Sequence, residues 1–499
     1  MEPGNRYLDS LPWQAAYAGL PSRLYTRTAP TPVAAPELVR VNDPLAWRLG
    51  LDPEALRRPD SIEALAGNRV PAGCDPIALA YAGHQFGHFV PQLGDGRAVL
   101  LGELPGPDGQ PNEIQLKGSG PTPFSRSGDG RAPIGPVVRE YLGGEALAGL
   151  GIPTTRALAA VTTGEPVHRL QAEPGGVLTR VARSHLRVGT LEYFHARGDT
   201  AAVRLLADLA LARHYPEQAQ GGHPYHGLLE SVTAATVELV ADWLSAGFIH
   251  GVMNTDNLSL AGETLDFGPF GFLDAYDPDT VYSSIDVYGR YAYDQQPGIA
   301  QWNLARLAET LLPLLHRDPE IAAAQAREVI DGFRPRFLRA LYDRLRGRIG
   351  LADAREGDEA LIADLLQRMA AGGADWTLTF RRLSDASSAG PERDGPVRDL
   401  FRDPAAFDAW AVQWRRRLAT EGRDDAERRA AMRAVNPAYI LRNHLAQWAV
   451  DAATRSLEFT PMERLLGVLA DPFADHPEEA DLAQPPEADE RVLQTFCGT

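Results

Sequence analysis

The spacing of apolar residues changes once along this 499-residue chain, near residue 190. Before that point, short apolar runs bounded by turn residues are typical of β-strands, which we expect at 97–103, 113–117, 156–163 and 176–183. One helical stretch, 136–150, interrupts them. Beyond residue 190, apolar residues recur every three or four positions, as in amphipathic helices. This order predicts an α+β fold with a small β-rich lobe, holding one helix, followed by a larger helical lobe.

The strongest helical pattern covers 228–247, where Gly247 stands at the position of a C-terminal cap. Further helices are expected at 300–316, 319–333, 336–347, 358–372, 405–420, 424–433 and 438–456. From these patterns we expect an extended N-terminal arm packed on the body (1–75), a β-rich lobe (76–195), a helical lobe with a C-terminal helical extension (196–470) and an acidic, flexible tail (471–499).

Charge and cysteine content exclude several classes of protein. The chain carries 49 basic and 66 acidic residues, a formal net charge of −17, which argues against nucleic acid or an anionic membrane as its partner. Only Cys74 and Cys497 are present, so no disulfide framework or thiolate metal site is expected. No apolar run approaches the length of a membrane span, about 18 residues, and no secretory signal is visible. A reducing cytoplasm is the expected compartment.

A single lysine stands out in this arginine-rich chain. All basic residues are arginines except Lys117, which ends the second strand of a predicted β-hairpin and precedes the glycine-rich segment 118–135. Lysine and arginine are exchangeable on most surfaces, but a compact ammonium is not replaced by a planar guanidinium at a phosphate site. The retained lysine therefore indicates a site that requires an ammonium group.

The segment that follows the strongest helix has the layout of a kinase catalytic loop and its metal-binding aspartate. Aligning His250 with the histidine of H-R-D-L-x-x-x-N puts Asn257 on the asparagine, and the triplet D-F-G begins at Asp266. Lys117 then takes the place of the phosphate-binding lysine, with Glu140 on the single helix as its ion-pair partner and Glu145 as the rival. Together, these motifs predict a protein-kinase-like, nucleotide-binding fold whose β-rich lobe binds the nucleotide.

The catalytic aspartate of that kinase motif is missing. Val252 stands in its place and can neither accept a proton nor orient a hydroxyl group. The nearest carboxylate is Asp256, which is either a base for an acceptor that arrives from another side or a loop residue that satisfies backbone amides. Ordinary γ-phosphoryl transfer is therefore in doubt.

Long strings of the sequence resemble the selenoprotein O (SelO, or YdiU) family, from about residue 8 to the end. The strings that carry the resemblance are YAGHQFGHFVPQLGDGRAVLLGE (81–103), GDGRAP (128–133), REYLGGEALAGLGIPTTRAL (139–158), LTRVARSHLRVGTLEYF (178–194), HGVMNTDNLSLAGETLDFGPFGFLDAYDP (250–278) and NPAYILRNHLAQWAV (436–450). The resemblance implies a protein-kinase-like fold that transfers AMP from ATP to Ser, Thr or Tyr hydroxyls of proteins; UTP is a second donor ascribed to the family. It also implies an inverted nucleotide, whose β- and γ-phosphates lie inside while the α-phosphate faces the acceptor.

The resemblance assigns roles to individual positions. Asp256 is the implied catalytic base, and Asn257 and Asp266 are the implied ligands of Mg²⁺ or Mn²⁺, which prefer oxygen donors. The implied nucleotide-binding residues are Gly94, Gly96, Arg97, Lys117, Asp129, Gly130, Arg180, Arg187 and Asp266, with Glu140 as supporting ion-pair partner. Cys497 resembles a redox-active tail position of some members. The segment 274–293 contains no cysteine to pair with it, so a regulatory disulfide is doubtful and a solvated thiol is the alternative.

Three other reactions or roles remain open on sequence grounds. An atypical kinase would transfer the γ-phosphate with Asp256 as its base, a UMP transferase would use UTP, and a pseudokinase scaffold would bind nucleotide without reaction. The choice between Mg²⁺ and Mn²⁺, the acceptor proteins and the oligomeric state are not determined by the sequence.

Overall fold

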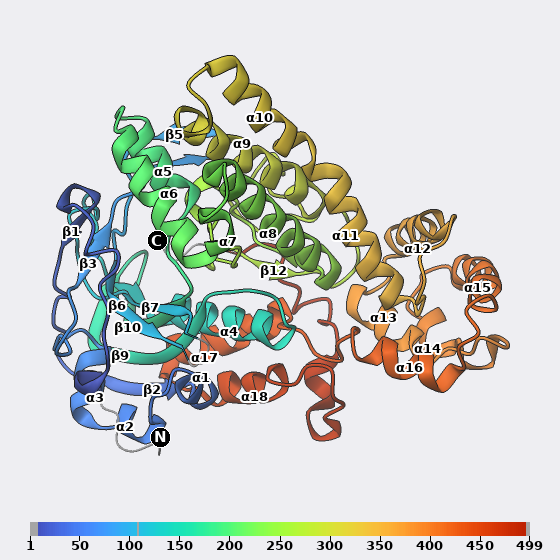
Figure 1. Ribbon diagram of the computed structural model, residues 1–499. Coiled ribbons are helices and arrows are strands. Elements are labelled where there is room, and N and C mark those ends of the chain that lie inside the picture. The colour runs from blue at the N-terminus through green and yellow to red at the C-terminus, as the bar shows by residue number, and fades with distance from the viewer. Residues whose placement is uncertain (1–7, 107–108, 496–499) are drawn as a thin grey trace.

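A computed structural model describes residues 8–106 and 109–495 of the chain (Figure 1). One antiparallel sheet carries the strands in the order β1, β3, β6, β7, β10, β9, β2, and β8 pairs with β10. Two further strand pairs, β4 with β5 and β11 with β12, lie apart from it. The strands are β1 Tyr25–Arg27, β2 Glu37–Val41, β3 Ile77–Leu79, β4 Gly83–Gln85, β5 His88–Val90, β6 Ala98–Pro105, β7 Pro111–Lys117, β8 Ala132–Pro133, β9 Arg156–His168, β10 Ala172–Ala182, β11 Phe248–Ile249 and β12 Gly271–Phe272.

The four strands expected from the sequence are confirmed, and each is longer than expected, β9 most of all. The hairpin of β6 and β7 pairs Ala98 with Lys117, which puts the lysine at the end of the ladder. The sequence pattern ends β9 at Thr163 because glycine and proline follow, but pairing with β10 resumes at Pro166 after an irregularity in register. Cross-strand pairing thus overrides the local turn signal.

Helices make up most of the chain after residue 187, as expected. They are α1 Asp43–Arg48, α2 Pro53–Leu56, α3 Pro59–Leu65, α4 Ile134–Gly149, α5 Val188–His195, α6 Thr200–His214, α7 Pro216–Ala219, α8 Pro224–Ala246, α9 Gln296–Leu315, α10 Pro319–Asp331, α11 Phe333–Arg348, α12 Asp358–Gly372, α13 Trp376–Leu383, α14 Gly395–Arg398, α15 Pro404–Leu418, α16 Asp425–Arg433, α17 Asn443–Ser456 and α18 Thr460–Leu469. The helix α4 packs on β9 and β10, and α17 and α18 pack against α4 (Figure 1).

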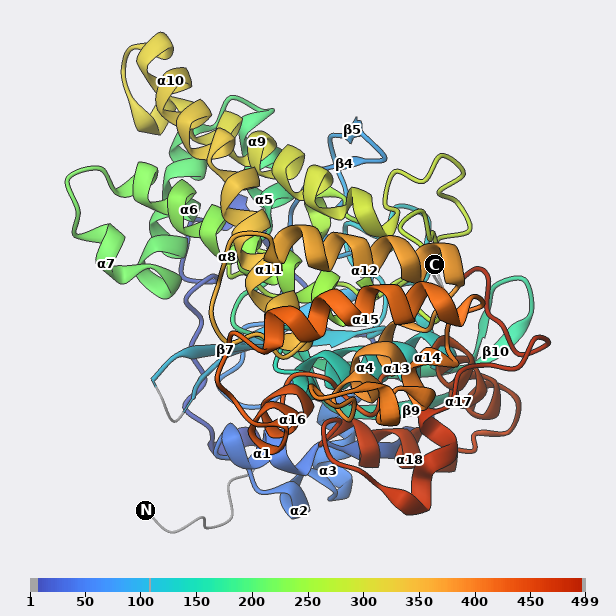
Figure 2. The same cartoon turned by 90° about the vertical axis from the view of Figure 1, so that its right-hand side faces the viewer.

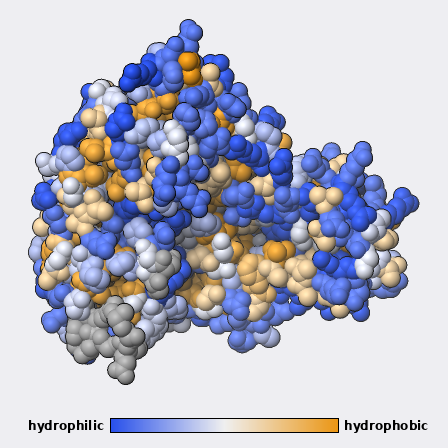
Figure 3. All heavy atoms as spheres, in the orientation of Figure 1, coloured by the Kyte–Doolittle hydropathy of each residue, from blue (hydrophilic) through white to orange (hydrophobic). Residues whose placement is uncertain are grey.

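The helical pattern of the sequence is largely confirmed. Gly247 ends α8 with φ of 75°, a left-handed conformation that glycine adopts without steric cost. The helix α17 starts at Asn443 rather than at 438, because the backbone N–H groups of Ala438 and Tyr439 donate to the carbonyl oxygen of Pro472 and Arg442 is extended. Helices α12 to α16 form an extension at the side of the molecule (Figures 1 and 2), and hydrophilic residues cover much of its surface (Figure 3). No described helix is both long and apolar enough to cross a bilayer.

The N-terminal residues differ from the expected extended arm. Residues 8–75 supply β1 and β2, the two outer strands of the sheet, and the three short helices α1 to α3. Pro44, Pro53 and Pro59 stand in the first turns of these helices, where a missing N–H costs nothing, whereas the proline-rich stretch 28–36 between β1 and β2 is free of helix. Leu45 and Leu56 are buried in a core shared with Leu116 of β7.

The acidic C-terminal segment also differs from expectation, since residues 471–495 pack on the body. Its charges are matched by arginines, because Asp475 lies 2.6 Å from Arg381 and 2.9 Å from Arg433. Leu482 is buried, and the backbone N–H of Thr495 donates to the carbonyl oxygen of Tyr282 at 2.7 Å. Cys497 lies outside the described residues. The lobe boundaries near 75, 195 and 470 stay predictions.

A buried ion-pair network ties the sheet to the first helices of the helical lobe. Glu113 of β7 accepts from Arg213 of α6 at 2.8 Å and from the backbone N–H of His185 at 2.6 Å, and Arg213 also contacts Glu103 of β6 at 3.0 Å. Burial alone would raise the pKa of Glu113, but Arg213 and His185 hold it at about 2. These contacts fix one lobe against the other.

Replacing Glu113 by Leu should destabilise the fold by about 3 kcal/mol or more, because it leaves buried cationic and polar groups without their partner. The measurement is urea unfolding followed by tryptophan fluorescence. Asp75→Ala is the control, since its ion pair with Arg27 is solvent-exposed and should contribute little. Equal midpoints for the two variants would contradict a stabilising role for the network.

Candidate active site

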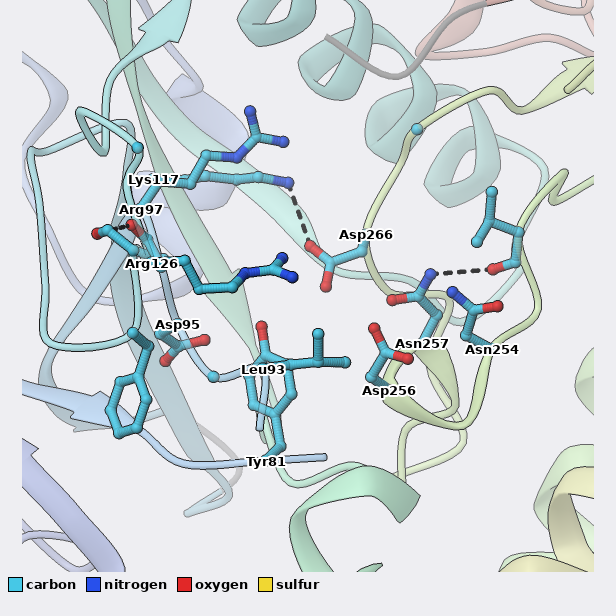
Figure 4. A pocket seen from close by; sticks show the side chains of 18 of the residues that line it. Tyr81, Leu93, Asp95, Arg97, Lys117, Arg126, Asn254, Asp256, Asn257 and Asp266 are labelled. Atoms are coloured by element: carbon cyan, nitrogen blue, oxygen red, sulfur yellow. Dashed lines mark hydrogen bonds and ion pairs between the residues drawn. The ribbon is translucent and has the colours of Figure 1, made fainter. Parts of the chain in front are cut away.

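A pocket of about 530 Å³ lies between the β-rich lobe and the loops that follow α8. Its size is ordinary for a small-molecule site. Figure 4 shows Lys117 on one side and Asp256, Asn257 and Asp266 on the other, directed toward the same space. All the candidate residues from the glycine-rich segments, the arginine pair and the D-F-G region line this pocket, whereas Glu140 lies behind Lys117.

Lys117 makes the ion pair that the sequence predicts. Its Nζ lies 2.6 Å from Oε2 of Glu140 on α4 and 3.1 Å from Oδ1 of Asp266. The rival carboxylate, Glu145, pairs instead with Arg156. The two glutamates are five residues apart and so point to different sides of α4, which explains why only Glu140 contacts the lysine.

Two buried arginines complete a cationic cluster around Asp266. Arg180 on β10 contacts Glu140 at 2.6 Å and Oδ1 of Asp266 at 2.5 Å, and Arg187 contacts Oδ2 of Asp266 at 2.7 Å. Their side chains are 2% and 1% exposed, so they are not surface charges. Burial by itself would raise the pKa of Asp266, but Arg180, Lys117 and Arg187 hold it well below its usual range.

The oxygens of Asn257 and Asp266 fit the donor set of a hard cation. Asp266 has φ of +62°, an uncommon conformation for a residue other than glycine. The Nδ2 of Asn257 donates to the carbonyl oxygen of Val252 at 3.0 Å, so the amide oxygen is turned toward Asp266 (Figure 4). Carboxylate and amide oxygens are ligands that suit Mg²⁺ or Mn²⁺.

Asp256 is a buried carboxylate with an unused oxygen. It lies in a 3₁₀ turn, Thr255–Asn257, and its carbonyl oxygen accepts from Nη1 of Arg187 at 2.8 Å. Its Oδ1 makes no hydrogen bond with any described residue. Burial raises the pKa of Asp256 to about 7, partly offset by Arg187. Such a group is suited to proton transfer near neutral pH.

The glycine-rich residues form the wall of the pocket next to Lys117. Gly94 and Gly130 have φ of 92° and 66°, and a Cβ at Gly94 would overlap the ring of Phe124. Gly96 and Arg97 also line the pocket. Asp129 also lines the pocket, but it is exposed and pairs with Arg169 at 2.9 Å, which makes it a support for this wall.

Three residues of the site, Tyr81, Asp95 and Gln115, were not identified from the sequence. The ring of Tyr81 lies 4.4 Å from the guanidinium of Arg187. The Gln115 oxygen accepts from Nη1 of Arg180 at 3.2 Å, and its amide nitrogen donates to Asp95 at 3.2 Å. Strand alternation could have identified Gln115, which shares a face with Lys117 two residues later. The sequence around Tyr81 and Asp95 gives no comparable signal.

The fold and the site together define a two-lobed, kinase-like nucleotide-binding protein, with a lysine–glutamate pair between sheet and helix and a D-F-G aspartate opposite. The chain belongs to the family described as protein adenylyltransferase SelO, whose model matches residues 8–470.

Named relatives match along nearly the whole length. The protein nucleotidyltransferase YdiU of Alkalilimnicola ehrlichii is 62% identical over 488 residues, which cover 98% of this chain and 99% of the relative. The protein of the same name from Bradyrhizobium sp. (strain ORS 278) is 58% identical with the same coverage. Among solved structures, ROP2 of Toxoplasma gondii, described as having a protein-kinase fold and no enzymatic activity, matches with a TM-score of 0.24, 11% identity, and coverage of 69% of this chain and 87% of ROP2. At that score, the fold assignment depends on the sheet and the ion pairs described above.

Gly83→Ala should displace Asp256, because a Cβ at Gly83 would overlap the Asp256 carboxylate. We expect a loss of nucleotidyl transfer of about 100-fold, the usual scale for a misplaced reacting group, with the unfolding midpoint little changed. Gly347→Ala is the matched control, since a Cβ there meets nothing within 4 Å. Transfer of label from α-³²P-ATP measures both, and wild-type rates in Gly83→Ala would show that the position of Asp256 is not critical.

Proposed function

We propose that this protein is a metal-dependent protein adenylyltransferase, which moves AMP from ATP to a Ser, Thr or Tyr hydroxyl of a protein and releases pyrophosphate. The observation that carries the proposal is the shared pocket: three cations, Lys117, Arg180 and Arg187, surround one carboxylate, and Asp256 lines the same cavity. Val252 occupies the position of the kinase base. The names of the family and of the relatives agree with this reaction.

In the proposed reaction the cations bind the β- and γ-phosphates, and the α-phosphorus faces Asp256. Asp256 removes the proton of the acceptor hydroxyl while the oxygen of that hydroxyl attacks the α-phosphorus. The bond between that phosphorus and the bridging oxygen of the β-phosphate breaks, and pyrophosphate leaves. Lys117, Arg180 and Arg187 stabilise the charge that accumulates on this leaving group through charge-assisted hydrogen bonds.

Asn257 and Asp266 would hold the divalent cation, either Mg²⁺ or Mn²⁺. When bound, the ion supplies Lewis-acid stabilisation of phosphate charge. An ion held there would compete with Lys117, Arg180 and Arg187 for the Asp266 carboxylate, so these side chains would be available to the phosphates. Glu140 keeps Lys117 and Arg180 in position, since it contacts both.

ATP labelled at either the α- or the γ-phosphate separates the possible reactions. We expect α-label on the acceptor protein, whereas γ-label would indicate a kinase and no label a nucleotide-binding scaffold. Competition with unlabelled UTP measures whether UTP occupies the same site as ATP, as a second donor would. We place the reaction in a reducing cytoplasm and expect no nucleic-acid partner, in line with two cysteines and a net charge of −17.

Lys117→Arg should lose most activity, about 100-fold, although the charge is kept. A planar guanidinium cannot make the close contacts of the Lys117 ammonium with both Glu140 and Asp266, and so it misplaces the phosphate contact. Steady-state transfer rates test this, with exposed Arg27→Lys as the control. Wild-type rates would mean that the solitary lysine has no special role.

Asp266→Ala should abolish metal-dependent transfer and lower the unfolding midpoint without unfolding the chain, because Glu140 still pairs with Lys117 and Arg180, whereas Arg187 keeps only backbone carbonyl partners such as that of Asp256. ATP affinity measured in EDTA should not fall, since the lost carboxylate competes with phosphate for the same cations. Transfer assays with and without added Mn²⁺ and circular dichroism provide the readouts. Full activity in this variant would show that the metal is held elsewhere.

A further inference from the structure

A short loop after β12 exposes three large apolar side chains next to the nucleotide pocket. Ile285, Val287 and Tyr288 are 65%, 78% and 94% exposed. The residue between them, Asp286, is buried, and its carboxylate accepts from the backbone N–H groups of Arg290 at 2.9 Å and Tyr291 at 2.7 Å. A loop that is anchored by its polar residue and exposes its apolar ones is typical of a contact surface rather than of a disordered turn.

This loop forms one wall of a groove of about 820 Å³, which we call the acceptor groove. Phe86 and His88, from the β4–β5 hairpin, and Ile299, near the start of α9, form the other walls. Figure 2 shows the hairpin and the loop on the same side of the molecule, and the rings of Phe86 and Tyr291 lie 5.0 Å apart. Phe86 and Ile285 line both this groove and the nucleotide pocket, so the two cavities adjoin.

Hydrogen bonds connect the groove wall to the catalytic turn. The backbone N–H of Phe86 donates to the Tyr291 hydroxyl at 3.1 Å, and that hydroxyl donates to Oδ1 of Asn254 at 2.6 Å. Asn254 stands two residues before Asp256. On the other side of the turn, the Thr255 hydroxyl donates to Glu192 and accepts from the backbone N–H of His84. The groove wall at Phe86 is therefore held in a fixed position relative to the turn that carries Asp256.

We propose that the acceptor groove binds an extended segment of the acceptor protein and selects an apolar side chain close to the modified hydroxyl. The proposal rests on the proposed function, since an acceptor is needed only if a group is transferred. The occupant follows from continuity: the hydroxyl must reach Asp256, and the groove that adjoins the pocket there exposes aliphatic and aromatic side chains, which bind apolar residues of a polypeptide. Val287 and Tyr288 provide this contact and do not line the nucleotide pocket.

The test uses a library of synthetic peptides, each with one central Ser, Thr or Tyr and with Leu or Lys at each flanking position, and β-casein as a protein acceptor. Val287→Asp and Tyr288→Asp should each raise the KM for casein about tenfold, the effect of losing one buried apolar contact. Affinity for a fluorescent ATP analogue should stay at the wild-type value. Val412→Asp is the matched control, because Val412 is an exposed apolar residue on the distant helix α15.

Peptide preference provides a readout that a folding defect would not change. The wild-type protein should favour Leu over Lys at one or more flanking positions, and Val287→Asp should reverse that preference at the same position. An unchanged KM for casein, or the same peptide preference in variant and wild type, would overturn the groove assignment. Absence of α-label on any acceptor with the wild-type protein would instead overturn the proposed function.

Discussion

The carboxylate of Asp266 is the contact on which the arrangement of the site depends. It brings together Lys117 at the end of β7, Arg180 on β10 and Arg187 at the start of α5, which come from both lobes. Burying two guanidinium groups without partners would cost several kcal/mol each. Because Asp266 and Glu140 neutralise them, the cations are held in position inside the fold before any ligand arrives, which is the condition for electrostatic catalysis.

Because Asp266 already neutralises these cations, a bound nucleotide would replace Asp266 as their partner. In the proposed function, a triphosphate would bring its own negative charge to Lys117, Arg180 and Arg187, and Asn257 and Asp266 would hold the divalent cation. Little side-chain movement is needed, since Glu140 and Gln115 continue to hold Arg180 from behind. Affinity in such a site comes from ordered cations that already point at the ligand and not from newly formed structure. The ion-pair network at Glu113 serves the same end by fixing α6 against the sheet.

Local sequence patterns predicted much of the fold and of the site. The features that they did not predict depend on contacts between residues far apart in the sequence. The hairpin that ends on Lys117, the helix capped by Gly247 and the spacing of Asn257 and Asp266 depend on neighbours in the sequence, so they could be predicted. The roles of Tyr81 and Gln115 depend on where Arg187 and Arg180 come to lie, which no local pattern determines. The N-terminal strands and the packed tail were missed for the same reason: β2 pairs with β9, and Thr495 contacts Tyr282. Acidic composition indicated a mobile tail only because its arginine partners lie far away in the sequence.

The position of Asp256 explains how this chain can have Val252 where the kinase motif has its catalytic aspartate. The Asp256 carboxylate packs against Gly83, its backbone carbonyl oxygen accepts from Arg187, and Asp256 lines the pocket that the acceptor groove adjoins. In the proposed reaction, a base there would serve a hydroxyl that enters past Phe86 and Ile285, which line both cavities. In the proposed reaction, a triphosphate bound through its outer phosphates by Lys117, Arg180 and Arg187 would present its α-phosphorus to that base. The position of the base and the direction of the nucleotide are thus two aspects of one geometric constraint.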